Sequence, residues 1–287
     1  MTRTVGIIAR TDRKESIDLA SKVVDDLEDR GIKVFLEPSL ATNLGQTEKS
    51  MTIRKMKTDL VVTIGGDGTI LRTCLRLPKP EPPILAIDMG ARGFLTEVQP
   101  NEAMEAIENY LGGRYFIERY GKLASFIGRA RLPDALNEVF ITSRHLAKLL
   151  YVRIWRDDLM VMDCRADGII ISSRVGSTAY AFSAGGPVLD PSLDAFVLTP
   201  VCPATLARPF VFPSDLEVRI ELIKPETAML VIDGDYQKRI NGRGSSILVK
   251  KSEWESSFIR FRGDFYKRLN TRLLFSREEG YESEKEK

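Results

Sequence analysis

The sequence predicts an α/β domain followed by an all-β domain. Before residue 100, apolar runs of strand length alternate with segments whose apolar residues recur at helical spacing. From about residue 115 to residue 261, short alternating segments separated by turn residues are typical of antiparallel strands. We therefore expect a doubly wound α/β domain over residues 1–99 and a sandwich-like β domain over residues 100–261.

The first hundred residues open with a βαβ pattern. Thr4–Ala9 and Ile32–Leu36 are predicted strands, and the helix between them is predicted to end at Gly31. The apolar residues of that helix are Ile17, Ala20, Val23, Val24 and Leu27. Further expected elements are a helix around 46–57, a strand over 60–64, a helix over 70–77 and a strand over 84–87. This order predicts a parallel sheet with helices on its faces.

The second part of the chain begins with a predicted helix over 101–111, which Gly112 and Gly113 end. Most of the chain from about residue 115 to residue 261 is then predicted to form short strands, for example at 122–127, 136–141, 149–155, 159–164, 169–172, 217–222, 229–232 and 246–250. Residues 276–287 contain five glutamates and almost no apolar side chain, so we expect a solvated or disordered tail.

The composition disfavours several classes of function. The 287 residues include 42 basic and 40 acidic side chains, a balance that gives no signal for a nucleic-acid or membrane partner. No apolar run has the length of a membrane helix, and three separated cysteines indicate reduced thiols, so we expect a cytoplasmic protein. The one histidine, His145, is expected in a surface loop, which disfavours a His-based triad or metal site. Cys202 is expected to be a packed thiol.

A Gly-rich turn follows the predicted strand over 60–64. Gly65, Gly66 and Gly68 let the backbone approach a phosphate closely, and a helix N-terminus presents unpaired N–H groups to the negative charge. Asp67 stands among them, and phosphates repel a carboxylate, so it is expected to act on a hydroxyl proton or a metal ion. The alternative is a turn aspartate that bonds its own backbone.

Three further stretches have both a functional and a structural interpretation. Phe94 follows another strand and is either a wall for a ring or core filler, and the stretch alone favours core filler. Asn137 and Glu138 are adjacent in a strand, so one is buried unless the strand ends there, and a ligand with hydroxyl or amide groups would supply partners. An edge strand with both residues exposed is the alternative. Asp233-Gly234 reads as a hairpin turn.

Residues 167–187 are the most informative stretch. A buried strand ends in a turn rich in small and hydroxyl side chains, followed by a short helix that carries Tyr180 and Ser183. Small residues, hydroxyls and one aromatic ring are typical of a nucleoside pocket. The pattern Gly-x-Ser-x-Gly is absent, which disfavours serine hydrolysis.

Taken together, these motifs resemble the NAD kinase family over about residues 5–274. They are Gly-Gly-Asp-Gly-Thr (65–69), Gly-x-x-Gly-Phe-Leu-Thr (90–96), Asn137-Glu138, Gly-Ser-Thr-Ala-Tyr (176–180), Ser-Ala-Gly-Gly-Pro (183–187), Pro-x-Cys-Pro (200–203) and Asp233-Gly234. The resemblance implies that residues 262–275 return to the first domain. It implies transfer of the γ-phosphoryl group of ATP, or of another donor such as polyphosphate, to the 2′-hydroxyl of the adenosine ribose of NAD. It further implies Mg²⁺ carried by ATP, no dedicated protein metal site, and a homodimer or homotetramer.

The resemblance also assigns roles to residues. Asp67 becomes the general base, Phe94 lies near the adenine, and Asp167 lies near the nicotinamide end. The other residues expected to bind the nucleotides are Gly65, Gly66, Gly68, Thr69, Asn137, Glu138, Gly176, Thr178, Ala179, Tyr180, Ser183 and Asp233. The chain departs from the usual family pattern at Asp88, Arg92, Arg174-Val175 and Asp235, which bears on donor choice and on the preference for NAD or NADH.

Two alternatives stay open at this point. One is a lipid or small-polyol kinase of the same superfamily, although no exposed amphipathic membrane segment is visible. The other is a non-catalytic dinucleotide sensor on the same fold, which the presence of Asp67 disfavours.

Overall fold

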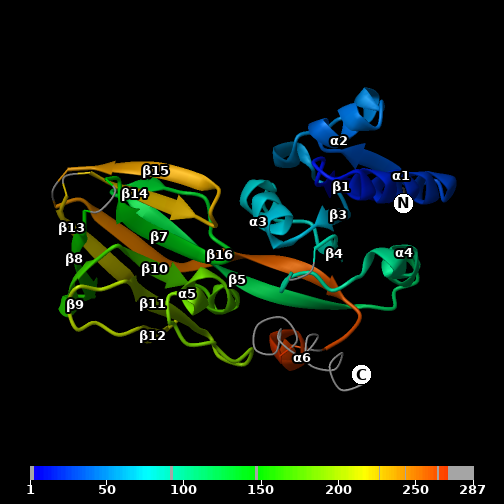
Figure 1. The fold of residues 1–287 in the computed structure, drawn as a ribbon. Helices are drawn as coiled ribbons and strands as arrows, with labels where there is room; N and C mark the ends of the chain where they lie inside the picture. The colour runs from blue at the N-terminus through cyan, green and yellow to red at the C-terminus, as the bar shows by residue number, and fades with distance from the viewer. Residues whose placement is uncertain are drawn as a thin grey trace, which may run out of the picture. The chain divides into compact units, whose positions relative to one another are not determined.

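A computed structural model describes residues 3–90, 93–145, 148–225, 227–242, 244–263 and 265–270 (Figure 1). The chain divides into two compact units, one formed by Met1–Arg119 with Ser257–Lys287 and the other by Tyr120–Ser256. The first unit therefore extends twenty residues beyond the expected boundary at residue 99 and includes the helix over 103–111. The tail over 276–287 lies outside the described residues.

The first unit contains a parallel sheet in the order β2-β1-β3-β4. Its strands are β1 (Thr4–Ala9), β2 (Lys33–Leu36), β3 (Leu60–Gly65) and β4 (Ile84–Asp88), and the end of β16 (Ser246–Arg260) adds to β4 in parallel through Phe258 and Ile84. All residues of β3 and β4 are buried, as expected of parallel strands covered on both faces. The doubly wound α/β fold predicted for this part of the chain is confirmed.

The helices of this unit are α1 (Lys14–Asp29), α2 (Pro38–Asn43), α3 (Asp67–Arg76), α4 (Ala103–Leu111) and α6 (Phe265–Leu269), with 3-10 turns η1 (Thr47–Lys49), η2 (Ile53–Lys55) and η3 (Pro100–Glu102). The helix predicted around 46–57 is wrong. Between the two turns the Met51 N–H donates to the Leu36 carbonyl at 2.8 Å, and Leu36 bridges to Ser50 in parallel. The segment thus runs extended beside β2, because pairing with the sheet edge replaces helical hydrogen bonds.

The second unit is built of antiparallel strands in two groups. One sheet has the order β12-β11-β10-β7-β14-β15, and the other group pairs β16, β13, β8 and β9. The strands are β5 (Phe116–Ile127), β6 (Ala130–Arg131), β7 (Glu138–Ser143), β8 (Leu150–Arg156), β9 (Leu159–Ala166), β10 (Gly168–Ser172), β11 (Ala195–Val201), β12 (Phe210–Pro213), β13 (Val218–Lys224), β14 (Thr227–Ile232) and β15 (Tyr236–Asn241). Burial alternates along β8, β13 and β14, as a sandwich requires. The all-β prediction is confirmed.

The structure also contains β6, β11, β12 and β15, which are not among the strands that the sequence patterns singled out. Pro200 interrupts the strand pattern of β11, yet β11 is buried beside β10, with Pro200 opposite Ile169. The edge strand β15 reads Tyr-Gln-Lys-Arg-Ile-Asn and has little apolar alternation. A short 3-10 turn, η4 (Val175–Thr178), and the one-turn helix α5 (Tyr180–Ser183) follow β10.

Candidate active site

The Gly-rich turn joins β3 to α3 in the first unit. Gly66 is the N-cap residue with extended backbone, and Asp67 is the first residue of α3, three residues earlier than the sequence predicts for this helix. A Cβ atom on Gly65 would lie 2.9 Å from Thr69 Cβ and 3.0 Å from Arg10 Cγ. Real Cβ atoms do not approach so closely, so the turn requires glycine at position 65 in order to hold Thr69 and Arg10 against it.

The carboxylate of Asp67 is held by backbone donors from a distant segment. The N–H of Phe94 donates to Oδ2 at 2.7 Å, and the N–H of Leu95 donates to Oδ1 at 3.0 Å. A Cβ atom on Gly93 would lie 3.0 Å from Asp67 Oδ1, so this glycine permits the approach. These two bonds reach 27 and 28 residues along the chain, beyond the local backbone that an ordinary turn aspartate would bond.

The side chain of Phe94 is covered by other residues of the first unit. Its ring packs edge-on against Phe265 at 5.6 Å between centroids, and the guanidinium of Arg268 lies 5.9 Å from the ring centroid. The residue is buried, in agreement with the core-filler interpretation of this stretch. Its backbone N–H rather than its ring meets Asp67.

In the second unit, Asp233 organises the start of β7. Its carboxylate accepts the N–H groups of Leu136, Asn137 and Glu138 at 2.7, 2.8 and 3.0 Å. Asp233 adopts a positive φ of 48° at the turn between β14 and β15. The predicted hairpin turn is confirmed, and it also ties this turn to β7.

Asn137 and Glu138 are both buried, with 7% and 8% of their surfaces exposed. The strand begins at Glu138, so the alternation of sides does not separate the two residues. Within the described part of the chain, Asn137 Oδ1 and Glu138 Oε2 have no hydrogen-bond partner. Buried polar atoms are nearly always paired in folded proteins, so these two oxygens are candidate contacts for a bound ligand.

Burial also changes the acidity of this pair. Loss of hydration raises the pKa of Glu138 to about 8, and the negative charge of Asp233 contributes to the rise. Loss of hydration raises the pKa of Asp233 to about 6, against the lowering effect of its three backbone donors and of Lys122. Glu138 is therefore mostly protonated at neutral pH and can donate as well as accept a hydrogen bond.

The segment after β10 lies at the same end of the sheet. Ser172 pairs with Glu138, and the Ser173 N–H donates to the Asn137 carbonyl at 2.8 Å. A Cβ atom on Gly176 would lie 2.7 Å from Asn137 Cα, so η4 packs directly on the backbone of Asn137. The structure thus brings together four of the expected binding segments of this unit, namely 137–138, 176–178, the following turn of α5, and Asp233.

The members of this cluster differ in exposure. The Thr178 hydroxyl donates to the Val175 carbonyl at 2.8 Å, and the N–H of Ala179 donates to the Gly176 carbonyl at 3.0 Å, so these contacts stabilise the turn. Tyr180 is exposed, and its ring packs edge-on against Phe140 at 5.3 Å. Ser183 ends the one-turn helix that Tyr180 begins.

Asp167 is not brought to this cluster within the unit. It precedes β10, whereas Ser172 and the turn that follows lie at the other end of that strand. Five residues of extended strand separate Asp167 from Ser172 by roughly 16 Å. Asp167 is exposed, and its carbonyl accepts the Thr142 hydroxyl at 2.8 Å.

The positions that depart from the family pattern have internal contacts where they are described. Asp88 is buried and accepts the Gly90 N–H at 2.9 Å. The guanidinium of Arg174 donates to the Pro191 carbonyl. Arg92 lies outside the described residues.

The structure also bears on the remaining expectations. His145 is exposed after β7, as predicted, whereas Cys202 is exposed with a positive φ of 45°, so the prediction of a packed thiol is wrong. A turn conformation outside the sheet leaves this side chain without the cover that a strand position would give. No group of three or more His, Cys, Asp or Glu side chains suited to a metal ion occurs among the described residues. No helix in the described ranges is long and apolar enough to cross a membrane.

A Gly-rich turn with a fixed carboxylate in an α/β unit, and a cluster of buried polar side chains in a β unit, fit a nucleotide-dependent phosphotransferase. Two family models match the chain: the ATP-NAD kinase N-terminal domain over residues 5–115 and the ATP-NAD kinase C-terminal domain over residues 136–261. The chain belongs to the NAD kinase family and is an enzyme.

Relatives and solved structures agree with this assignment. An NAD kinase of Methanothermobacter thermautotrophicus is 43% identical over 94% of this chain and 96% of its own length. An NAD kinase of Thermococcus sibiricus is 37% identical over 93% and 98%.

A crystal structure of an NAD kinase from Archaeoglobus fulgidus in complex with ATP has a TM-score of 0.76 and 28% identity, covering 92% of this chain and 96% of that one. Yeast NADH kinase complexed with NADH has a TM-score of 0.87 at 22% identity over 95% and 87% of the two chains, which shows a shared fold. A lipid or polyol kinase and a non-catalytic sensor are not favoured by these comparisons.

Proposed function

We propose that this enzyme transfers the γ-phosphoryl group of ATP to the 2′-hydroxyl of the adenosine ribose of NAD and so forms NADP. The bond between the γ-phosphorus and the bridging oxygen of ATP breaks, a bond from the ribose oxygen to that phosphorus forms, and ADP leaves. Phosphoryl transfer requires mainly positioning and charge neutralisation from a protein. The family membership and the fixed carboxylate of Asp67 together support this reaction.

Asp67 is the proposed general base that removes the proton of the 2′-hydroxyl. Two backbone N–H groups fix the orientation of its carboxylate, and this is the observation that carries the proposal. A carboxylate has about four lone-pair sites on two oxygens, so a carboxylate that is oriented by backbone N–H groups can also take up a substrate proton. Asp67 also begins α3 directly after the Gly-rich turn, where backbone N–H groups are available for phosphate oxygens.

The polar cluster of the second unit, formed around Asn137 and Glu138, is the proposed binding site for the dinucleotide. The unpartnered oxygens of Asn137 and Glu138 would accept hydrogen bonds from its hydroxyl or amide groups, and the protonated Glu138 would also donate one. Tyr180 offers an exposed ring for packing. Binding of Asp167 to the nicotinamide end remains part of this proposal.

Magnesium is proposed to enter with the donor triphosphate, where it neutralises phosphate charge. The chemistry of the site fits this arrangement. The carboxylate of Asp67 accepts the N–H groups of Phe94 and Leu95, and the N-terminus of α3 offers backbone N–H groups to the phosphates that carry the ion.

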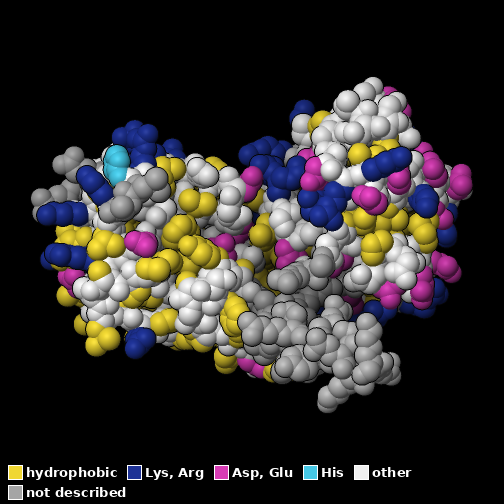
Figure 2. Space-filling model, in the orientation of Figure 1, with side chains coloured by type: hydrophobic (Ala, Val, Ile, Leu, Met, Phe, Trp, Pro, Cys, Tyr) yellow, Lys and Arg dark blue, Asp and Glu magenta, His cyan; other side chains and the backbone are white. Residues whose placement is uncertain are grey.

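We also propose a cytoplasmic homo-oligomer, either a dimer or a tetramer. Apolar side chains are exposed on the edge strand β12, where Phe210 and Val211 have 49% and 43% of their surfaces accessible. Figure 2 shows apolar side chains spread over the face of the second unit that carries β10, β11 and β12. An edge strand of this kind is a ready surface for a second copy of the chain.

The test is an NAD phosphorylation assay with ATP, GTP and inorganic polyphosphate as donors, using the wild type and Asp67→Asn. The wild type is expected to form NADP with at least one donor, and Asp67→Asn is expected to retain NAD binding by calorimetry while kcat falls by about 10²–10⁴. Asp26→Asn, which alters an exposed pair with Arg30 on α1, is the control and is expected to turn over normally. Turnover of Asp67→Asn at the wild-type rate would disprove the general-base role.

A further inference from the structure

Arg260 is a buried arginine at the end of β16. A single residue, Leu95, links it to Asp67 by hydrogen bonds. Arg260 has 1% of its surface exposed and is the bulkiest fully buried side chain among the residues that the structure describes. Its Nε donates to Glu118 Oε2 at 2.7 Å, and its Nη1 donates to the Leu95 carbonyl at 2.8 Å. A buried guanidinium costs free energy, and replacing such a pair by apolar groups is often no worse for stability. Its presence here therefore calls for a reason beyond stability.

The contacts of Leu95 supply that reason. Its N–H donates to Asp67 Oδ1 at 3.0 Å, while its carbonyl accepts from Arg260. One residue is thus hydrogen-bonded to the base on one side and to the buried cation on the other. A continuous series of hydrogen bonds therefore runs within the first unit from Asp67 through Leu95 and Arg260 to Glu118. Hydrogen bonds in such a series polarise and orient one another.

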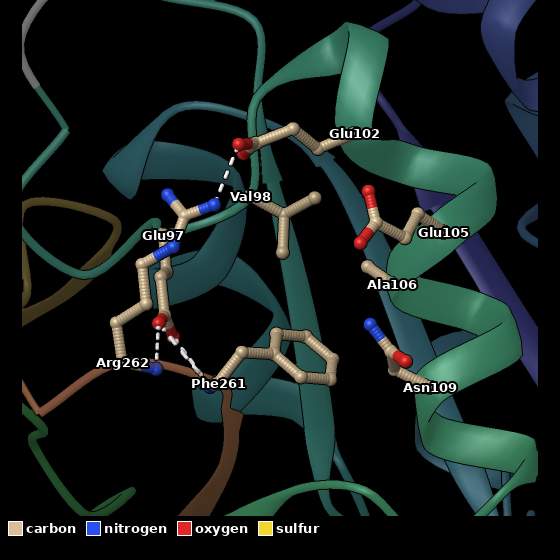
Figure 3. A pocket seen from close by; sticks show the side chains of 8 residues that line it. All are labelled: Glu97, Val98, Glu102, Glu105, Ala106, Asn109, Phe261 and Arg262. Carbon is tan, nitrogen blue, oxygen red and sulfur yellow. Dashed lines mark hydrogen bonds and ion pairs between the residues drawn. The ribbon is translucent and has the colours of Figure 1, made fainter.

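A second attachment fixes the same two segments. The Glu97 carboxylate accepts the backbone N–H groups of Phe261 at 3.2 Å and of Arg262 at 2.6 Å. Figure 3 shows these bonds at the rim of a pocket beside α4, together with the ion pair of Arg262 and Glu102. The segment over 94–97 is therefore held against residues 260–262 at two points, so its N–H groups have a fixed direction.

We propose that Arg260 is a positioning residue for Asp67. It holds the Leu95 peptide so that the N–H groups of Phe94 and Leu95 keep the carboxylate in one orientation. Arg260 acts through the backbone of this segment and does not contact the substrates. The inference rests on the proposed role of Asp67 as the general base.

The fork geometry of arginine is needed for this role. Nε and Nη1 bond two acceptors, the Glu118 carboxylate and the Leu95 carbonyl, from separate positions of one rigid plane. A lysine has a single ammonium nitrogen and cannot reproduce that plane. Arg260→Lys therefore keeps the charge that balances Glu118 and Glu97 but loosens the Leu95 peptide.

The first test compares Arg260→Lys with Arg262→Lys, the matched control. Arg262 lies two residues further on, and its exposed side chain pairs with Glu102. Arg260→Lys is expected to lower kcat by about tenfold to a hundredfold with KM for NAD and for ATP nearly unchanged, because a misplaced base slows only the chemical step. The control is expected to keep wild-type kcat. Equal kcat values for Arg260→Lys and the wild type would overturn the inference.

The second test is a double-mutant cycle with Asp67→Asn, read in the residual turnover. If Arg260 acts through Asp67, adding Arg260→Lys to Asp67→Asn is expected to lower kcat by less than about twofold, because the group that it positions is already disabled. An additive loss would show a merely structural role and overturn the inference. Should Arg260→Lys fold poorly by circular dichroism, Glu118→Gln replaces it in both tests, with the same expected non-additivity.

These outcomes separate the inference from the proposed function. Wild-type turnover of Asp67→Asn contradicts the general-base role and with it the inference. An inactive Asp67→Asn combined with a fully active Arg260→Lys contradicts the inference alone.

Discussion

Glu138 and Asp233 show, at the scale of single residues, how burial controls side-chain chemistry in this protein. Loss of hydration raises the pKa of Glu138 to about 8 from a reference of 4.5, and the pKa of Asp233 to about 6 from 3.8. For an acid this means that the folded chain holds a proton that the unfolded chain has released. The unfolded state is therefore favoured progressively as the pH rises between the two pKa values.

This shift predicts a pH-dependent stability. Between about pH 4.5 and pH 8, Glu138 is ionised in the unfolded chain but protonated in the folded one, so the free energy of unfolding falls as the pH rises through this window. Glu138→Gln removes that titration. Urea unfolding at pH 5.5 and pH 8 is expected to show a loss on the order of a few kcal/mol in the wild type and a smaller loss in the variant.

The control for this prediction is Glu217→Gln, which alters an exposed pair with Lys250. It is expected to keep the wild-type pH dependence. An equal fall in stability for the wild type and Glu138→Gln would show that Glu138 is ionised in the folded protein.

At the scale of elements, the junction of β3 and α3 depends on close backbone approach at one glycine and not at its neighbour. A Cβ atom on Gly65 would meet Thr69 and Arg10, whereas a Cβ atom on Gly66 would have no atom within 4 Å. Gly65→Ala is expected to destabilise the fold by about 1–3 kcal/mol, the usual cost of overpacking. Gly66→Ala is expected to change the free energy of unfolding much less.

Thermal or urea unfolding of the two variants tests this difference directly. A loss for Gly65→Ala as small as that expected for Gly66→Ala would mean that Thr69 and Arg10 move aside without cost. In that case the turn would not hold its neighbours in the positions seen here.

At the scale of the whole molecule, the exposed edge of β12 bears on assembly. Phe210→Glu places a charge on this apolar edge, so it is expected to shift the proposed homo-oligomer toward monomer in sedimentation equilibrium, because burying an unpaired charge in an interface is costly. Ile117→Glu makes the same change at an exposed position of β5 in the first unit and is the control. An unchanged mass for Phe210→Glu would exclude β12 as the contact between copies.

The pattern of apolar residues was sufficient to predict the fold class of each part of the chain. The βαβ opening, the strand before Gly65 and the β-rich second part all follow from local periodicity, which reports the faces that each element buries. Sequence patterns gave the wrong element where hydrogen bonding to a neighbouring strand overrides the local conformational preference of the chain. The extended segment at 50–52 bonds to Leu36, and β11 is buried despite Pro200. The expected boundary at residue 99 likewise missed that α4 and residues up to Arg119 belong to the first unit.

The candidate site likewise combines residues that the sequence pointed to with contacts that only the tertiary structure shows. The sequence singled out Asp67, Asn137 and Glu138 because glycine turns and polar pairs within apolar runs are unusual locally. Asp233 was locally a hairpin turn, and only the family resemblance made it a candidate binding residue. Only the tertiary structure shows that Asp67 is held by residues 27 and 28 positions away, and that Asp233 holds the start of β7 from 95 to 97 positions away. The contact of Arg260 with Leu95 spans 165 positions. Such bonds join segments that folding alone makes neighbours, and they leave no periodic signal in the chain.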